Sequence, residues 1–293
     1  LSWAAVAVAF GEVLLGSWTR INGAGLTCPD YPLCRGRLVP AFDGGVIWEW
    51  THRFTALALS VLVLWAIAIA LSRRAAATPF VRPAAAIVGA LFLFQVYLGA
   101  ATVKLANSPL SVVWHWGTAM ALIAALASLA IFASQDRSAP RRNDRAAAAI
   151  TGCAALIAFA TMCIGAYVSS SGAGLACTTI PGCAGSVIVY GDGQFVQMLH
   201  RAAAGLSLLA AVAAFTFAWI HRAGTRVRIW TAAGLALVFV QIILGLLNVA
   251  LRLPLELREA HAATAALIFL CFVCATAFAA LEAAPNRETA GVA

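Results

Sequence analysis

Long apolar runs alternate with short polar segments along the whole chain. The hydrocarbon core of a bilayer requires about 20 apolar residues per helix. By that criterion the apolar runs predict membrane-spanning helices at residues 1–18, 46–71, 84–103, 110–133, 146–168, 195–221, 229–250 and 257–281. The predicted fold class is therefore an all-α membrane protein with eight transmembrane helices.

The segments between these runs differ in charge, and the difference predicts their orientation. The segments after the second, fourth and sixth runs are cytoplasmic by the positive-inside rule. Their arginines are Arg73, Arg74, Arg82, Arg137, Arg141, Arg142, Arg145, Arg222, Arg226 and Arg228. The segments after the first and fifth runs are longer, and each contains two cysteines. We expect a multi-pass protein of the cell (plasma) membrane, with the cysteine-containing loops on the outer face. Arg20, Arg35, Arg37, Lys104, Arg252 and Arg258 also lie on that side and weaken the bias.

The two halves of the chain repeat the same landmarks in the same order. Residues 23–28 recur at 172–177, an offset of 149, and His52-Arg53 recurs as His200-Arg201, an offset of 148. An offset of 146 relates Gln95, Gly99 and His115 to Gln241, Gly245 and His261. Because each half holds an even number of runs, both halves insert the same way up. The repeat predicts two four-helix bundles, residues 1–137 and 138–293, related by a pseudo-twofold axis along the membrane normal.

Composition supports the membrane assignment. The chain is 63% hydrophobic and only 10% charged, far from the values of soluble globular domains. Lysine and arginine exceed aspartate and glutamate by 19 to 11. The arginines nevertheless lie between apolar runs, where they act as topology signals. We therefore expect a lipid bilayer as partner and no nucleic acid.

Four of the five histidines occupy repeat-equivalent positions near the outward ends of even-numbered runs: His52, His115, His200 and His261. A single histidine in a membrane helix usually satisfies an interhelical hydrogen bond. Two facing imidazoles in each four-helix bundle instead suit axial ligation of a haem iron. Zinc, copper and a proton relay are the alternatives, but zinc usually takes a third or fourth ligand. The only candidates for that ligand are Glu49 and loop cysteines.

The loop cysteines and three arginines are further candidates for a functional site. The pairs Cys28/Cys34 and Cys177/Cys183 lie in loops on the oxidising side, which predicts disulfides. A structural staple is the favoured interpretation, and a redox role stays open. Arg20, Arg53 and Arg201 lie near outer helix ends, where they could bind haem propionates or simply extend to the interface.

One position distinguishes the two halves. Glu49 stands one turn before His52, whereas its repeat equivalent is Gln197. A carboxylate can take a proton or stabilise a developing cation, and an amide can do neither. We therefore assign chemistry to the first half and a permanent haem to the second. Glu12, which shows no partner in the sequence, and Glu259, on another helix face than His261, are the rival carboxylates.

The run from Arg20 to Cys34, the motif Glu49-x-x-His52-Arg53, His115, His200-Arg201 and His261 together resemble the haem A synthases, the COX15/CtaA family, of the bacterial cysteine-containing type. The resemblance covers essentially the whole chain. It implies two four-helix bundles, with haem b bound by His200 and His261 in the second. It further implies that His52 and His115 face the substrate haem o in the first bundle, that Glu49 acts in catalysis, and that the cysteine pairs are disulfides. The implied reaction oxidises the C8 methyl of haem o through an alcohol to the formyl group of haem a, for cytochrome oxidase.

Two other classes of protein fit part of the pattern. A di-haem electron-transfer protein explains the four histidines but not the difference between Glu49 and Gln197. A transporter built from parallel repeats explains the duplication but not the paired imidazoles. If the chain is an enzyme of the family it resembles, the expected partners are haem o, the enzyme that makes haem o and an electron donor. A second copy of the chain, in a homo-oligomer, is a further expected partner.

Overall fold

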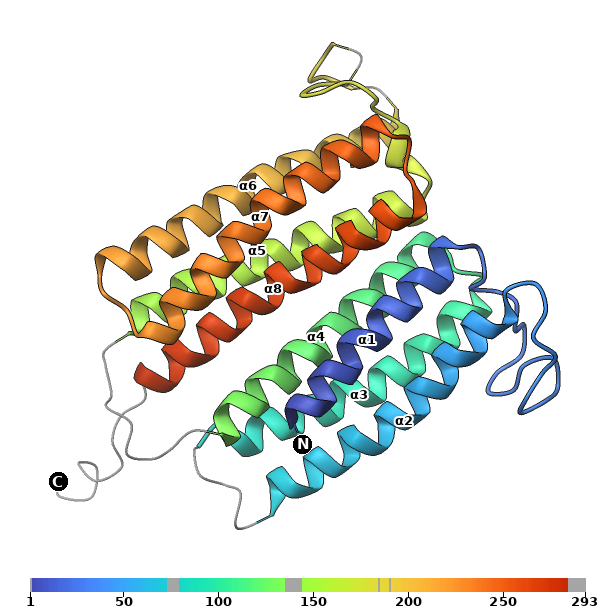
Figure 1. The fold of residues 1–293 in the computed structure, drawn as a ribbon, viewed down its shortest axis with the longest axis horizontal. Coiled ribbons are helices and arrows are strands. Elements are labelled where there is room, and N and C mark those ends of the chain that lie inside the picture. The colour runs from blue at the N-terminus through green and yellow to red at the C-terminus, as the bar shows by residue number, and fades with distance from the viewer. Residues whose placement is uncertain (1, 73–78, 135–143, 184, 190, 284–293) are drawn as a thin grey trace.

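The computed structural model describes residues 2–72, 79–134, 144–183, 185–189 and 191–283. Within this part of the chain all the long secondary-structure elements are α-helices (Figure 1). The elements are α1 (Ser2–Ile21), α2 (Val46–Leu71), α3 (Val81–Lys104), α4 (Pro109–Ala133), α5 (Arg145–Ser170), η1 (Ala173–Leu175), α6 (Asp192–Ile220), α7 (Thr225–Ala250) and α8 (Leu255–Ala283). All eight α-helices are long and apolar enough to cross a membrane, which confirms the predicted fold class.

The predicted boundaries are close to those of the structure. The second helix has the predicted bounds, and the seventh begins at Thr225, four residues before the predicted start. Polar residues complete such first turns because they lie outside the apolar core of the span. The start at Leu1, the boundary between residues 137 and 138, and Arg73, Arg74, Arg137, Arg141 and Arg142 of the predicted cytoplasmic segments lie outside the described residues.

Each half of the chain packs its helices in the same cyclic order. In the first half α1 contacts α2 and α4, and α3 contacts the same two helices. In the second half α5 and α7 each contact α6 and α8. The bundles meet where α4 contacts α5 and α8 and where α1 contacts α8 (Figure 1).

This arrangement makes α4 and α8 the central helices. Met120 and Leu126 of α4 and Phe272 of α8 are fully buried. By contrast, the outer helices expose large apolar side chains such as Leu93 of α3 and Leu209 of α6. In a bilayer these side chains contact lipid, where a helix is stable because it satisfies its own backbone hydrogen bonds.

The connection between α3 and α4 and that between α7 and α8 share an unusual backbone conformation. Ala106 and Asn107, between α3 and α4, both have positive φ angles, of 50° and 53°. Arg252 and Leu253, 146 residues later between α7 and α8, have φ angles of 60° and 64°. This agrees with the internal repeat, while the pseudo-twofold axis itself stays a prediction.

Both cysteine-containing loops extend from one end of the molecule, toward the upper right of Figure 1, and the N-terminus lies toward the other end. The even-numbered helices all begin at the loop end, because successive helices run in opposite directions. The four candidate histidines, which lie near those helix starts, are therefore near this end. Which side of the membrane it faces stays a prediction.

Candidate functional site

The four repeated histidines lie within about two turns of the first residues of α2, α4, α6 and α8. Each histidine ring lies against a glycine of the preceding helix. A Cβ atom added at Gly16 would lie 2.7 Å from Cε1 of His52, and one at Gly165 would lie 2.9 Å from Cε1 of His200. The corresponding distances are 3.3 Å for Gly99 with His115 and 3.2 Å for Gly245 with His261. The glycines thus leave room that each ring occupies.

In the second bundle the two imidazoles face each other. The ring centroids of His200 and His261 are 6.4 Å apart, with an angle of 73° between the ring planes. Two metal–nitrogen bonds of about 2 Å placed end to end, with half a ring at each side, span about 6 Å. The pair therefore fits a metal held by one imidazole on each side.

The donor set favours a haem iron over a bare metal ion. No group of three or more His, Cys, Asp or Glu side chains that could hold a metal ion occurs within the described residues. Zinc would require such a group, whereas a haem iron takes its other ligands from the macrocycle. The residues of the second bundle thus fit a haem.

The histidines of the first bundle have polar partners on neighbouring helices. Nδ1 of His52 lies 2.6 Å from Oε1 of Glu12 in α1, and the hydroxyl of Thr55 donates a hydrogen bond to Oε2 of the same carboxylate. Nδ1 of His115 lies 3.1 Å from Nε2 of Gln95 in α3.

Glu12, for which the sequence shows no partner, therefore has two on α2. Helix α1 packs on α2, and that packing brings together residues 40 positions apart, which no local spacing reveals. A signal was nonetheless present. Glu12 precedes Gly16 by four residues, the spacing that Gln95 and Gly99 share. Glu259, the other rival carboxylate, lies near Arg20 and Ser17 of α1.

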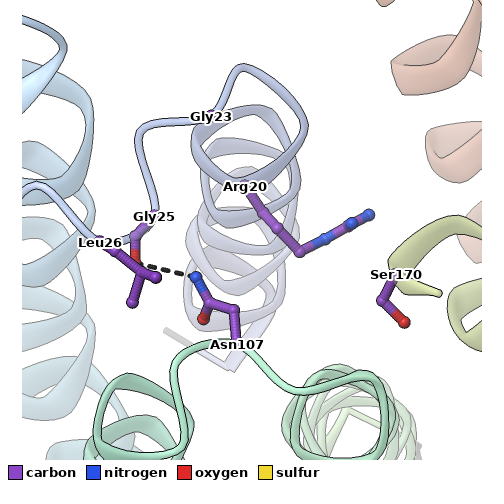
Figure 2. Close-up of a pocket in the computed structure, with 6 residues that line it drawn as sticks. All are labelled: Arg20, Gly23, Gly25, Leu26, Asn107 and Ser170. Atoms are coloured by element: carbon purple, nitrogen blue, oxygen red, sulfur yellow. Dashed lines mark hydrogen bonds between the residues drawn. The ribbon is translucent and has the colours of Figure 1, made fainter. Parts of the chain in front are cut away.

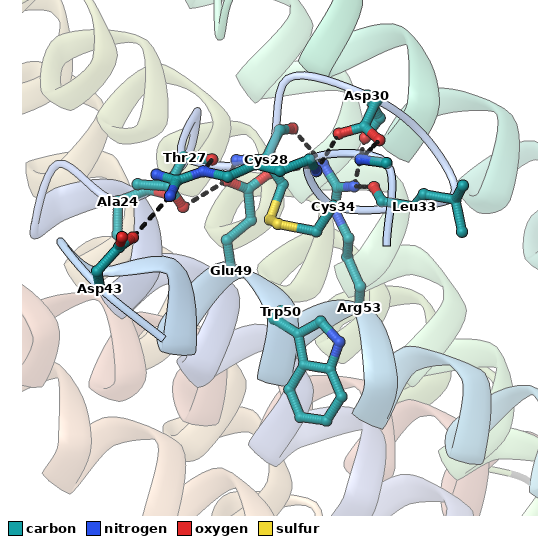
Figure 3. Close-up of a disulfide and its surroundings, with 12 residues drawn as sticks. Ala24, Thr27, Cys28, Asp30, Leu33, Cys34, Asp43, Glu49, Trp50 and Arg53 are labelled. Atoms are coloured by element: carbon teal, nitrogen blue, oxygen red, sulfur yellow. Dashed lines mark hydrogen bonds and ion pairs between the residues drawn. A yellow bond between two sulfur atoms is a disulfide. The ribbon is translucent and has the colours of Figure 1, made fainter. Parts of the chain in front are cut away.

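Glu49 lies beneath the first cysteine loop and is buried, with 4% of its surface exposed. Its Oε2 accepts hydrogen bonds from the backbone N–H of Cys28, at 2.8 Å, and from the hydroxyl of Thr27, at 2.9 Å. Its Oε1 lies 2.7 Å from the guanidinium of Arg53 (Figure 3). The carboxylate is thus held in one orientation as an ion paired with arginine.

Arg53 also binds the loop directly. Its guanidinium donates to the backbone carbonyls of Cys28, Asp30 and Leu33. The second loop uses the same scheme without a carboxylate. There Oε1 of Gln197 accepts from the N–H of Cys177, and Arg201 donates to loop carbonyls, those of Cys177, Thr179, Pro181 and Gly182. Each glutamate or glutamine, with its arginine, anchors a loop to the start of a helix.

Both predicted disulfides are present, Cys28–Cys34 and Cys177–Cys183, and all four cysteines are buried. The first loop has a further polar anchor in Asp30. Its carboxylate accepts hydrogen bonds from the N–H groups of Gly36, at 2.8 Å, and Arg35, at 2.6 Å. These bonds, that of Gly36 foremost, lower the pKa of the Asp30 carboxyl.

Arg20 lies at the junction of the two bundles. It lines a pocket of about 280 Å³ together with Gly23, Gly25, Leu26, Asn107 and Ser170 (Figure 2). Its guanidinium donates a hydrogen bond of 3.0 Å to the hydroxyl of Ser169 in α5, and Asn107 donates one of 3.0 Å to the carbonyl of Gly25. Arg20 thus links α1 to the second bundle at the loop end.

The chain is similar to known proteins over most of its length. The family model described as COX15-CtaA, cytochrome oxidase assembly protein, matches residues 1–273. Among curated relatives, a "Heme A synthase" of Shewanella oneidensis is 26% identical, with 89% of this chain and 90% of the relative covered. Relatives with the same name are 28% identical in Bacillus pumilus, covering 88% of both chains, and 30% identical in Symbiobacterium thermophilum, covering 71% of both. With its eight candidate spans and duplicated histidines, the chain belongs to the COX15-CtaA family of cytochrome oxidase assembly proteins.

Proposed function

We propose that the protein is a haem A synthase, a membrane oxidoreductase that converts haem o to haem a. The family membership and the names of the relatives support this reaction. In the reaction implied by the resemblance, the C8 methyl of haem o is oxidised through an alcohol to a formyl group. We further propose a division of labour in which the bundle of residues 1–137 takes the substrate and that of residues 138–293 holds haem b.

The observation that carries this division is the placement of carboxylates. In the first bundle Glu12 touches His52 and Glu49 lies one turn before it, whereas the equivalent positions of the second bundle hold Thr161 and Gln197. A group that must accept protons or stabilise positive charge is useful where bonds change. A carrier that only exchanges electrons has no use for acids on one side.

In the second bundle His200 and His261 would hold haem b through their imidazoles. Bound there, haem b supplies one-electron redox chemistry. The protein's part is to fix the two rings, which Gly165 and Gly245 do by close approach, and to keep the site away from bulk water.

In the first bundle we assign His52 and His115 to the substrate haem and Glu49 to catalysis. The hydrogen bonds that Glu49 accepts from Cys28 and Thr27, and its contact with Arg53, support a carboxylate fixed at the loop end of the bundle. Such preorganisation lets a negative charge stabilise a cation without reorientation during the reaction.

For the haem propionates we propose Arg20, because it lines a pocket beside the bundle junction. Arg53 and Arg201, also predicted to bind propionates, already donate to several loop carbonyls. We therefore assign these two arginines to holding the loops above the haem sites. We place those loops on the outer face and expect the source of haem o and an electron donor as partners.

The test is mass spectrometry of haems extracted from cells that make haem o, with and without this protein. We expect the alcohol and formyl products only when the protein is present. Unchanged haem o, in cells whose purified protein carries haem on its histidines, would instead support the electron carrier.

A further inference from the structure

We propose that Glu12 is a positioning residue for His52, holding its imidazole with Nδ1 toward α1 and leaving Nε2 for the iron of the substrate haem. The proposal deepens the proposed function and rests on it, because it assumes that His52 faces the substrate. It concerns a carboxylate other than Glu49 and a different helix.

Glu12 contacts α2 through both oxygens of its carboxylate. Oε1 lies 2.6 Å from Nδ1 of His52, and Oε2 accepts from the hydroxyl of Thr55, one turn further along α2. The side chain of Glu12 is 10% exposed and that of His52 is 26% exposed. A largely buried carboxylate with two partners on one helix is fixed in direction, and so is the ring that it touches.

Gly16 completes this support. It follows Glu12 by one turn of α1, and its missing side chain admits the His52 ring, since a Cβ there would lie 2.7 Å from Cε1. Helix α1 therefore touches the ring at its carbon edge through Gly16 and at Nδ1 through Glu12. The same added Cβ would lie 3.1 Å from Nε2, so Gly16 packs against the Cε1–Nε2 part of the ring while Glu12 lies at Nδ1.

The internal repeat shows that Glu12 occupies a defined position in a recurring unit. In each odd-numbered helix, a polar residue stands four positions before the glycine that touches a histidine. The pairs are Glu12/Gly16, Gln95/Gly99, Thr161/Gly165 and Gln241/Gly245. Among these four polar residues, only Glu12 is a carboxylate. His52 is thus the one repeated histidine whose partner at this position carries a negative charge.

The chemistry of imidazole explains what the charge does. A neutral imidazole has one N–H donor and one nitrogen with a free lone pair. A carboxylate 2.6 Å from Nδ1 favours the tautomer with its proton on Nδ1 and its lone pair on Nε2, the form that ligates iron. Such carboxylate partners also make the imidazole a stronger donor to the metal. An amide or hydroxyl supplies no charge, so His52 would differ from the other three histidines as a ligand.

The experiment uses the full-length protein, purified with its own haem b, and haemin as the probe for the first bundle. We expect Glu12→Gln to weaken haemin binding about 10- to 100-fold and to change the low-spin electron paramagnetic resonance signal of the added haem. Haem b content should stay unchanged, which verifies the fold. Gly11→Ala is the matched control on α1, because nothing lies within 4 Å of that position, and it should leave haemin affinity unaltered.

A second variant separates positioning from a merely structural contact. In a His52→Ala background, Glu12→Gln should cause no further loss of haemin affinity, because its effect acts through the ring. An equal loss in both backgrounds, or unchanged affinity and signal in Glu12→Gln alone, would overturn the proposal. If the unaltered protein formed no haem a but Glu12→Gln still weakened haemin binding, the enzyme assignment would fail and the positioning role would stand.

Discussion

The two bundles use the same backbone plan, the same loop anchors and the same histidine–glycine contacts, yet they differ in charge. In the first bundle His52 meets the carboxylate of Glu12, and Glu49 anchors the loop. In the second, Thr161 and Gln197 stand at those positions, and Gln197 makes the equivalent bond to the loop with an amide oxygen. An amide is therefore sufficient to anchor a loop. The comparison indicates that the carboxylates of the first bundle serve something beyond architecture.

The largest effects are expected when a candidate haem-ligating histidine is removed, because the two bundles should then lose different functions. His200→Ala removes one side of the facing imidazole pair and should abolish haem b binding. His52→Ala should leave haem b in place and stop haem a formation. Haem content of the purified variants, measured as the pyridine haemochrome, checks both. Loss of haem b from the His52 variant alone would reverse our assignment of the two bundles.

Exchanging the loop anchors tests the difference in charge. Glu49→Gln keeps an acceptor for the N–H of Cys28, as Gln197 does for Cys177, but removes the ion pair with Arg53. We expect product formation to fall by about 100-fold or more, the range of a lost general acid–base or charged group, with haem b retained. Rates of alcohol and formyl haem formation give the readout.

Gln197→Glu is the reciprocal control for Glu49→Gln. It should leave product formation close to that of the unaltered protein, because the second bundle performs no bond-changing step. If Glu49→Gln also lost haem b, the two bundles would not be independent, and the division of labour would be refuted.

The histidine–glycine contacts predict a smaller effect, similar in both bundles. Gly165→Ala would place a methyl group 2.9 Å from Cε1 of His200, and overpacking of this kind typically costs about 1–3 kcal/mol. We expect weaker haem b retention during purification. Gly205→Ala, at a position with nothing within 4 Å, is the control and should behave like the unaltered protein. Equal haem content in both variants would show that the ring can move aside.

The smallest effect concerns the first loop alone. Because hydrogen bonds from Gly36 and Arg35 lower the pKa of Asp30, its contribution to loop stability is present above the ordinary pKa of the carboxyl. The contribution disappears as the pH falls through the lowered value. Asp30→Ala should therefore reduce hydrogen-exchange protection of the Arg35 and Gly36 amides at neutral pH. At strongly acidic pH, after correction for intrinsic exchange rates, the variant and the unaltered protein should converge.

Asp43→Ala is the matched control for that measurement. It removes only the exposed ion pair between Asp43 and Arg35, and such surface pairs contribute little. Similar protection of both amides in the Asp30 and unaltered proteins at neutral pH would contradict the anchoring role of Asp30.

The fold could be predicted because its determinants are local. Each span requires its own apolar run, and a helix in lipid makes all its backbone hydrogen bonds within itself. The spans, such as that of residues 46–71, can therefore be predicted from the local sequence. The disulfides could be predicted for a similar reason, since each cysteine pair is six residues apart in a short loop. The histidine positions followed from the repeat.

The partners of the site residues could not be predicted in the same way. The contact between Glu12 and His52 depends on how α1 packs against α2, and the direction of the Glu49 side chain depends on where the first loop folds back. Likewise, only the packed bundles bring Arg20 next to Ser169, 149 positions away. By itself the sequence determined which segments span the membrane, which residues repeat and where the halves differ in charge. Tertiary structure alone decided which side chain each charge meets, because those contacts form between helices whose spacing in the chain leaves their relative rotation open.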